Sequence, residues 1–576
     1  MRRTVPLVVA LIAAITLVLT GCGGGGGGNA TGSGGSETGA VAEGGILRVG
    51  SINYIDSFNP FHFIESQSYN AFIMLYPQLV QYDFEDGAYK IVGDLADSWD
   101  TSANGKDWTF HLKSGTKWSD GQPLTAEDVA WTANITAKYA NGPTAVMAPA
   151  LAHLKSAEAT DPTTVVLHYK TPVGNVLAQL EQFFVVPQHV WEKFDTGDGK
   201  GLKTYAPEND ISSMVTGGAF TLKQYEKKGT TVFIPDPNYW GEKAHVEAVA
   251  LTYYTNADSM IADMKSGQVD WVDQVPFNAV DVLKKDSNIV VQQIPGAETT
   301  NITWNSNPYK DKNRELLDPQ VKKALSMCVD RDKIIEVVFN GYADKVESLP
   351  GTISLYENKN LGPLEHDCAA GNAMLDQLGY KKGPDGIRIA PATTGKYAQP
   401  AHKMQYEIMQ PTSLDFNGPR AFDIVKEGFA EAGVDVTLKI GGDSTAAYEI
   451  ETTDHCDAST NSGYTGWDIA MWDWVGYIDP DFMLSVVTKG QWCSWSDTGW
   501  DNPDYDALYE KQGTTVDEKE RASIVQQMEQ MIYDNWVYTQ LVEEQYIDAH
   551  TTGWDGMDPH LNAYAKMYWT RPHKTG

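Results

Sequence analysis

The stretch WTFHLKSGTKWSDGQPLTAEDVAWT, residues 108–132, carries clear signals for a strand, two turns and a helix. The alternation of apolar and polar residues in WTFHL, residues 108–112, predicts a half-buried strand. The dipeptides S-G and D-G predict turns on either side of a short strand at residues 116–118. Thr125 and Asp128 have the spacing of a capping box, so a helix is expected to begin there. The stretch therefore predicts a hairpin packed beside a capped helix.

The same stretch raises an enzymatic alternative, because Ser114 and Lys117 form an S-x-x-K motif and residues 574–576 read K-T-G. Both motifs occur in serine β-lactamases and penicillin-binding proteins, where the serine begins a helix and the K-T-G lies on a strand beside the site. Here Gly115 interrupts the first motif between strand-like segments, and the second motif is the last tripeptide. We interpret both as coincidental and predict no catalytic residue, hence no enzyme.

The N-terminal segment has the pattern of an export signal. Arg2 and Arg3 precede an apolar run at residues 5–19, which ends in L-T-G-C. This resembles the bacterial lipoproteins and implies a signal peptide over residues 1–21 and a lipidated Cys22. A plain cleaved signal is the alternative. The Gly/Ser-rich residues 22–45 then form a tether between a membrane anchor and a folded body.

Composition limits the remaining possibilities. The chain has 576 residues and a net charge of −32, which argues against nucleic acid as a partner. No later segment is apolar enough to span a membrane. The residues beyond the tether are too many for one core, so two or three lobes are expected.

Four cysteines follow Cys22. In an oxidising compartment their even number suggests two disulfides, and sequence alone leaves three pairings open. We favour Cys328 with Cys368 and Cys456 with Cys493. No two of them have the spacing of a zinc site, and we predict neither a metal nor a cofactor.

Residues 91–129, IVGDLADSWDTSANGKDWTFHLKSGTKWSDGQPLTAEDV, resemble the signature segment of the family 5 extracellular solute-binding proteins. These are the dipeptide, oligopeptide and nickel receptors of ABC importers. The resemblance continues, in the order typical of the family, in TGGAFTLKQY (216–225), PDPNYWG (235–241), NADSMIADMKSGQVDW (256–271), DPQVKKALSMCVDRDKII (318–335) and DNPDYDALYEKQ (501–512). It thus covers nearly all of the chain beyond the tether.

This resemblance implies an α/β, bilobal periplasmic-binding-protein-like fold of type II with an extra small lobe, built from mixed sheets flanked by helices. The implied lobes are discontinuous. Residues 46–80, 212–305 and 546–576 form lobe I, residues 81–211 the added small lobe, and residues 306–545 lobe II.

Local patterns support mixed α/β structure. A strand at residues 246–255, a helix capped by Asp258 and ended by Gly267, and a strand at residues 269–272 follow one another. Amphipathic helices are predicted at residues 321–340, 419–432 and 518–536.

The segment DIAMWDWVGYIDPDFML, residues 468–484, resembles the part of the family that contacts the ligand in peptide receptors. The resemblance implies ligand contacts for Trp472, Asp473, Trp474, Tyr477 and Asp479. The sequence departs from the family pattern, since Tyr477 stands where an ammonium-binding aspartate is expected. The amine could then be met by one of the two aspartates, or the solute is not a peptide. Turn and cap chemistry is the alternative role for both aspartates.

A second candidate segment follows the first strand. Ile64, Glu65 and Ser66 match by position the residues that line the cleft floor in the family. His62 lies nearby, but a lone histidine is more often structural than a metal ligand.

The resemblance thus implies a receptor of an ABC importer that captures a peptide or peptide-like solute by hinge closure and delivers it to a membrane permease. We expect an exported monomer, lipid-anchored at the outer face of the cytoplasmic membrane. The alternatives are a secreted hydrolase, a sensor or chaperone on the same fold, and a receptor for a non-peptide or metal-chelate solute.

Overall fold

The computed structural model describes residues 44–85, 88–411, 418–441, 466–557, 559–562, 565–567 and 569–575. The predicted signal peptide, Cys22, Cys456 and all but the last two residues of the tether lie outside these ranges. Among the described residues, no helix is long and apolar enough to cross a membrane.

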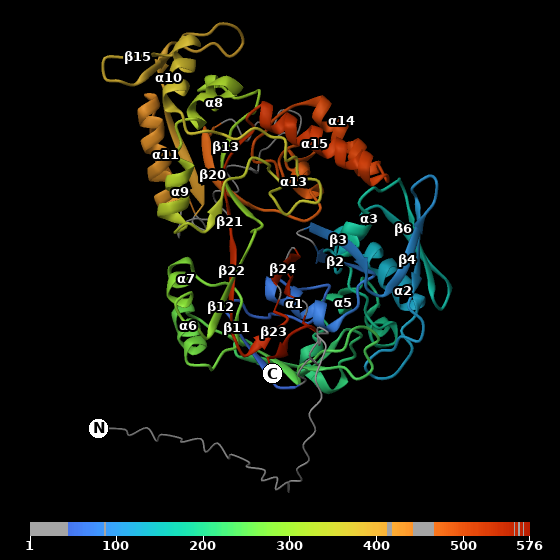
Figure 1. Cartoon of the computed structure of the whole chain (residues 1–576). Coiled ribbons are helices and arrows are strands. Elements are labelled where there is room, and N and C mark those ends of the chain that lie inside the picture. Colours follow the sequence, from blue (N-terminus) through green and yellow to red (C-terminus); the bar gives the residue numbers. More distant parts are fainter. Residues whose placement is uncertain are drawn as a thin grey trace, which may run out of the picture. The chain divides into compact units, whose positions relative to one another are not determined.

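Two mixed sheets organise the structure (Figure 1). The first has seven strands in the spatial order β12 (Ile289–Ile294), β22 (Tyr546–Thr551), β11 (Trp271–Val272), β1 (Ile46–Ser51), β10 (Ala248–Tyr253), β9 (Thr230–Pro235) and β8 (Phe220–Gln224). The second has six strands in the order β14 (Ala343–Asp344), β21 (Tyr538–Glu544), β13 (Glu298–Trp304), β20 (Ile469–Val475), β18 (Gln405–Pro411) and β19 (Asp435–Gly441). The predicted mixed α/β class is confirmed.

A third sheet contains residues 108–112, the predicted half-buried strand. It has four antiparallel strands in the order β4 (Ala96–Thr101), β5 (Asp107–Leu112), β7 (Thr164–Tyr169) and β6 (Leu154–Asp161). A hairpin precedes it, formed by β2 (Val80–Glu85) and β3 (Ala88–Gly93). We call the structure around the seven-stranded sheet the first lobe and that around the six-stranded sheet the second lobe. The small lobe is the four-stranded sheet with the hairpin and the helices packed on them.

Helices cover these sheets. Those of the first and small lobes are α1 (Ser66–Leu75), α2 (Ala126–Lys138), α3 (Val176–Leu180), α4 (Gln188–Trp191), α5 (Lys200–Thr204), α6 (Ala257–Lys265) and α7 (Phe277–Leu283). Those of the second lobe are α8 (Pro319–Ser326), α9 (Arg331–Val338), α10 (Cys368–Gln377), α11 (Gly418–Ala432), α13 (Asp481–Ser485), α14 (Pro503–Thr514) and α15 (Glu518–Asp534). Short pairings complete the fold: β15 (Lys381–Lys382), β16 (Arg388–Ala390) and β17 (His402–Lys403); β23 (Trp554–Asp555) with β26 (His573–Lys574); and β24 (Pro559–Asn562) with β25 (Ala565–Met567).

The first lobe and the small lobe share one hydrophobic core. A single cluster of buried side chains includes Leu47 and Val49 of β1 together with Phe110 and Val165 of the four-stranded sheet. The second lobe has separate clusters, one of which contains Ile302 of β13. Because packed interiors transmit displacement, the first and small lobes are expected to move as one body.

The two large sheets are joined by two short crossings. β12 leads into β13 through residues 295–297, and β21 leads into β22 through Gln545. The crossings run side by side, because β12 and β22 pair in the seven-stranded sheet and β13 and β21 pair in the six-stranded sheet. A Cβ on Gly296 would lie 2.7 Å from the carbonyl carbon of Glu544 and closer still to its oxygen, so only glycine lets the two crossings run this close together. Two adjacent extended segments of this kind can act as a hinge.

Most predicted elements are present. β5 agrees with its predicted range, α2 begins where it was predicted to, and Thr125 and Asp128 form the complete capping box. Gly115 and Gly121 take the left-handed conformation that their turns require, with φ of 74° and 86°. The predicted strand at residues 116–118 is wrong, because the two turns leave room only for one bridge between Lys117 and Pro123.

Three further predictions are corrected. The expected helix at residues 321–340 is two helices, α8 and α9, because the Asp330 side chain accepts a hydrogen bond from the Lys333 amide and caps a new helix. Asn256, not Asp258, caps α6, since its side chain accepts from the amide of Ser259. The strand predicted at residues 269–272 is reduced to the two residues of β11.

The lobe boundaries expected from the sequence stay a prediction. β13 lies within residues 212–305, which were assigned to the first lobe, but it pairs with β20 and β21 in the six-stranded sheet. Cys328 and Cys368 form a disulfide, which is the favoured pairing. Cys493 is also disulfide-bonded, and its predicted partner Cys456 lies outside the described residues.

Both ends of the described chain meet in the first lobe. The carbonyl oxygen of Gly45 accepts a hydrogen bond from the amide of Glu247, 2.8 Å away. Two residues earlier, the amide of His245 donates to the carbonyl oxygen of Thr570 over 3.4 Å. Residues 245–247 therefore bind the beginning of the chain and its last segment together.

Candidate functional site

The predicted ligand-contact residues lie on β20 and on the turn that follows it. β20 pairs with β13 so that Asp473 lies opposite Thr300 and Trp474 opposite Thr299. Since side chains alternate along a strand, Asp473 projects from one face of the sheet and Trp472 and Trp474 from the other. The predicted ligand-contact residues of β20 therefore lie on opposite faces of the six-stranded sheet.

Trp474 belongs to the core of the second lobe. Its side chain is 7% exposed and packs in a cluster with Met483 and Val525. Its indole Nε1 donates a hydrogen bond to Asp497 Oδ2 over 3.0 Å. Burial raises the pKa of Asp497 to about 7, although the hydrogen bonds from Tyr538 and Trp474 oppose this shift. A ligand contact of Trp474 stays a prediction, while its packing is a structural fact.

Asp479 already has a cationic partner inside the protein. Arg521 donates two hydrogen bonds to its carboxylate, 2.5 and 2.8 Å long. Asp479 also accepts from the amide of Asp481, as turn-forming aspartates do. A planar bidentate pair of this kind fixes the turn strongly. Its charge is therefore compensated before any solute arrives.

Asp473 has the opposite environment. It lies at the hinge end of the six-stranded sheet with Glu298 of β13 and Glu544 of β21. Burial and the neighbouring carboxylates raise the pKa values of Glu298 and Glu544. Glu298 also shares a hydrogen bond with Asp473. Among the described residues, no lysine or arginine forms an ion pair with any of these three carboxylates.

A cleft of about 390 Å³ separates the turn after β20 from the small lobe. This volume lies within the range of about 300–1,000 Å³ typical of small-molecule sites. The second lobe contributes Tyr477, Ile478, Asp479, Asp481, Phe482 and Ser485, and the small lobe contributes Tyr82, Pro149, Ala150, Ala152, Asn175, Ala178, Gln179, Glu181 and Gln182. Of the predicted residues, Tyr477 and Asp479 thus line the cleft.

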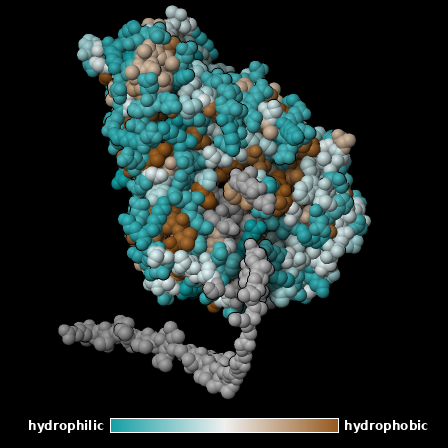
Figure 2. All heavy atoms as spheres, in the orientation of Figure 1, coloured by the Kyte–Doolittle hydropathy of each residue, from teal (hydrophilic) through white to brown (hydrophobic). Residues whose placement is uncertain are grey.

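Aromatic rings form the wall of the cleft on the second lobe. The ring of Phe482 lies 5.5 Å from that of Tyr477, 6.1 Å from Trp474 and 5.8 Å from Trp495, all in edge-to-face geometry. Trp495 is half exposed. In Figure 2, hydrophobic side chains gather around the hollow near the centre of the molecular face. This wall offers apolar surface to a solute, as binding pockets typically do.

Nothing in the sequence indicated the small-lobe residues that line the cleft. Asn175, Gln179 and Gln182 lie on or beside α3, which carries no motif that marks a site. Tyr82 follows a regular strand pattern in β2. These residues reach the cleft only because the small lobe faces the second lobe, and this tertiary arrangement leaves no local signal. Phe482 could have been found, since it lies in the segment that resembles the family's ligand-contact region.

The second predicted segment does not line this cleft. Ile64 is 82% exposed, and Glu65 precedes α1 without a side-chain hydrogen bond to the helix. Asp56 orders the loop by accepting from the amides of Ile64 and Glu65 over 3.1 Å. Ser66 is the first residue of α1, and His62 is exposed. Ligand contacts of these residues stay a prediction.

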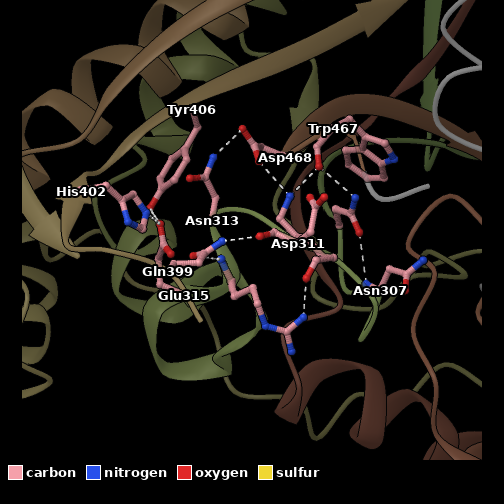
Figure 3. A network of polar contacts seen from close by, with 12 residues as sticks. Asn307, Asp311, Asn313, Glu315, Gln399, His402, Tyr406, Trp467 and Asp468 are labelled. Atoms are coloured by element: carbon pink, nitrogen blue, oxygen red, sulfur yellow. Dashed lines mark hydrogen bonds and ion pairs between the residues drawn. The ribbon is translucent and has the colours of Figure 1, made fainter. Parts of the chain in front are cut away.

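A buried polar network fixes the start of β20 (Figure 3). Lys310 Nζ, which is fully buried, donates to Asp468 Oδ1 over 2.8 Å and to the carbonyl oxygen of Trp467 over 2.6 Å. Asn313 donates to the other carboxylate oxygen of Asp468 over 2.9 Å. Because a buried charge is tolerated only with such partners, this network ties the loop after β13 to β20. The strand that leads to the cleft is therefore rigidly positioned.

The enzymatic motifs do not form a site. Ser114 lies in an exposed turn, not at the start of a helix. Lys574 belongs to the short strand β26. Within the described ranges, no group of three or more His, Cys, Asp or Glu side chains is arranged to hold a metal ion.

Comparisons with known proteins agree with this geometry. The profile of the bacterial extracellular solute-binding proteins, family 5 Middle, matches residues 90–493. A probable D,D-dipeptide-binding periplasmic protein of Escherichia coli (strain K12) is 23% identical over 520 residues, which are 87% of this chain and 89% of that protein.

Two solved structures have the same fold. The ABC transporter substrate-binding protein CtaP of Listeria monocytogenes superimposes with a TM-score of 0.75 at 19% identity, over 93% of this chain and all of that one. The periplasmic binding protein DppA of Helicobacter pylori, in complex with the peptide STSA, gives a TM-score of 0.66 at 20% identity, over 92% of this chain and 98% of that one. They confirm the predicted fold. Because the family profile covers more than half of its length, the chain belongs to the bacterial extracellular solute-binding proteins of family 5.

Proposed function

We propose that this protein captures a peptide or peptide-like solute in the cleft between the small lobe and the second lobe, and delivers it to the permease of an ABC importer. The observation that carries the proposal is a cleft lined from two lobes whose described residues are joined along the chain by two short crossings. Lobes connected in this way can rotate about the crossings and enclose a solute. The similarity to a probable D,D-dipeptide-binding periplasmic protein supports a peptide-like solute.

The aromatic wall and the polar side chains opposite it suit such a solute. Tyr477 and Phe482 offer ring faces and edges to apolar side chains. Asn175, Gln179 and Gln182 offer amide groups that can pair with main-chain amides. A main-chain group enclosed by the lobes needs such partners, because an unsatisfied buried donor or acceptor costs about 1–3 kcal/mol.

Asp473 does not line the cleft, so the cationic end of the solute is proposed to extend beyond the cleft lining toward Asp473 instead of pairing with Asp479. Arg521 already compensates the charge of Asp479. Asp473 lies in a group of three carboxylates where burial raises the pKa values of its neighbours. A cation placed beside them would favour their charged forms. Asp473 would then replace the aspartate that the family has at the position of Tyr477.

The cellular setting is part of the same proposal. The pattern of residues 1–21 supports export, and Cys22 would carry a lipid that holds the protein at the outer face of the cytoplasmic membrane. Residues 22–45 would give the receptor the reach to meet a permease. We propose that it acts as a monomer and makes no chemical change to its solute.

The test is direct binding of synthetic peptides of two to five residues, followed by native mass spectrometry and titration calorimetry. Tyr477→Ala should weaken the binding of the best peptide at least tenfold, because it removes a ring from the cleft wall. The melting temperature of the empty protein should change little, since Tyr477 is only partly buried. Absence of any bound peptide would remove the proposed function, and unchanged affinity of Tyr477→Ala would remove this cleft as the site.

A further inference from the structure

A second contact between the lobes lies beside the cleft. The end of α14 and the turn that follows it, residues 512–516, approach the small lobe at Gly105 and Gly174. The amide of Gly174 donates a hydrogen bond of 2.8 Å to the carbonyl oxygen of Gly513. Val516 packs against the shared core of the first and small lobes. We call this contact the clasp.

Gly174 is required by the clasp and not by its own backbone. A Cβ at this position would lie 2.9 Å from the carbonyl carbon of Thr515, 3.0 Å from the carbonyl oxygen of Gln512, and closer still to the oxygen of Thr515. All three atoms are main-chain atoms of the second lobe, so they cannot rotate away. The φ angle of Gly174 lies outside the left-handed region, and alanine is therefore acceptable within the small lobe itself.

Gly105 shows the contrast. A Cβ there would lie 2.8 Å from Val516 Cγ2, which also belongs to the clasp. However, Gly105 has a φ of 67°, so its own turn requires glycine whatever the second lobe does. A substitution at Gly174 should therefore disturb the contact between the lobes without disturbing the folding of the small lobe.

The clasp and the cleft are directly connected. Asn175, the next residue after Gly174, lines the cleft. On the other side, Gln512 donates through Nε2 to Asp481, a cleft residue, over 2.5 Å. Gln512 also accepts from Arg521, the partner of Asp479, over 3.1 Å. A displacement of the turn therefore displaces the polar groups of the cleft.

The clasp lies across the cleft from the hinge. In Figure 1, the hinge strands β21 and β22 run between the two large sheets, whereas the ends of α14 and α15 approach the small lobe on the far side of α13. The contact joins two bodies with separate cores, the first and small lobes on one side and the second lobe on the other. Rotation about the hinge must break it, because a point far from the axis moves most.

We infer that the clasp is a closure contact: it forms when the lobes shut on a solute, and Gly174 is the positioning residue that permits the shut state. This inference rests on the proposed function. It predicts that an added methyl group at Gly174 holds the lobes apart, so that a captured solute leaves faster. The association rate should be unaffected, because encounter takes place while the clasp is open.

The test compares Gly174→Ala with Gly142→Ala, a small-lobe control. Gly142 is exposed, its φ lies outside the left-handed region, and a Cβ there would meet only one atom, 3.7 Å away. The probe is the best-bound synthetic peptide of two to five residues, followed by stopped-flow tryptophan fluorescence. Gly174→Ala should raise the dissociation rate at least tenfold, equivalent to about 1.4 kcal/mol. The control should match the wild type, and the empty proteins should melt at the same temperature.

Val516→Ala is a second variant that removes apolar contact without a main-chain clash. It should raise the dissociation rate about threefold. Equal dissociation rates for wild type and Gly174→Ala would overturn the clasp while leaving the proposed function intact. A lower melting temperature of empty Gly174→Ala would also overturn it, because the contact would then be a permanent part of the fold. If the wild type binds none of the peptides, the proposed function and the clasp fall together.

Discussion

Trp474 and Tyr477 are three residues apart in one predicted ligand-binding segment, yet their environments differ. Trp474 points into the second lobe, where it is almost completely buried and hydrogen-bonded to Asp497. Tyr477 follows the end of β20 and lines the cleft. The family resemblance identified the segment, but it could not assign each side chain to core or cleft. That assignment depends on the strand register against β13, which the sequence does not reveal.

Replacement of Trp474 by phenylalanine should therefore affect stability more than a surface change does. Trp474→Phe keeps an aromatic ring in the cluster but removes the donor to Asp497. The loss of a hydrogen bond to a buried acceptor costs about 1–3 kcal/mol, so the melting temperature of the empty protein should fall. Calorimetry of Trp474→Phe and of Trp495→Phe, whose ring is half exposed, provides the comparison. Equal melting temperatures for the two variants would contradict the structural role of Trp474.

At the scale of elements, Asp128 of the α2 capping box also binds two neighbouring segments of the small lobe. Asp128 accepts hydrogen bonds from the amide of Thr125, from Trp118 Nε1 and from the amide of Gln188. The sequence predicted the first of these bonds from the T-x-x-D spacing. It could not predict the other two, because they join residues whose distances from Asp128 in the chain carry no pattern.

Asp128→Ala should accordingly destabilise the protein more than Thr125→Ala. The threonine change removes one capping oxygen and should cost about 1 kcal/mol. The aspartate change leaves three donors without their acceptor, two of which, Trp118 Nε1 and the amide of Gln188 at the start of α4, come from segments packed against α2. Chemical denaturation of the two variants should give a clearly lower midpoint for Asp128→Ala. Identical midpoints would show that Asp128 acts only as a helix cap.

The split of the expected helix at residues 321–340 has an equally local cause. Asp330 interrupts an otherwise continuous amphipathic pattern and caps α9. The signal was present in the sequence, because aspartate is a strong N-cap residue. The apolar periodicity continues across Asp330 and hides the cap. α10 likewise begins after an aspartate, because the Asp367 side chain accepts a hydrogen bond from the amide of Ala370.

At the scale of the whole molecule, the sequence indicated the family and the mixed α/β class, but not which surfaces face one another. The cleft residues of the small lobe and the clasp both arise where two lobes approach. Gly174 looks like an ordinary loop glycine in the sequence, and only its proximity to Thr515 gives it meaning. Contacts between lobes are set by the hinge and by the packing of each lobe, not by short motifs.

Several buried acids should make the stability of the empty protein depend on pH. Burial raises the pKa values of Glu529 and Glu543 from 4.5 to about 7, although hydrogen bonds to both carboxylates oppose this. Between about pH 4.5 and 7 the folded state therefore holds protons that the unfolded chain releases. Stability falls as pH rises through this window. The empty protein should melt at a higher temperature at pH 5 than at pH 8.

The variant Glu529→Gln tests the origin of this effect. Glutamine is neutral at every pH. The free energy of unfolding of the variant should therefore fall less with rising pH than that of the wild type, by about 1.4 kcal/mol for each unit by which the pKa of Glu529 is raised. The Ser348 hydroxyl and the Asn358 amide, which donate to Glu529, can still find the carbonyl oxygen of the glutamine. A pH dependence identical to that of the wild type would mean that other groups produce it.

The meeting of both chain ends at residues 245–247 has a mechanical consequence. A force applied between the two ends of the described chain first loads the hydrogen bonds of residues 245–247 in the first lobe. Attachment of a surface or a reporter close to residue 44 or residue 575 would therefore hold the first lobe, and would leave the proposed rotation of the second lobe possible. For the same reason, a short peptide bridge between the termini would permit circular permutation, with new ends placed on the opposite lobe.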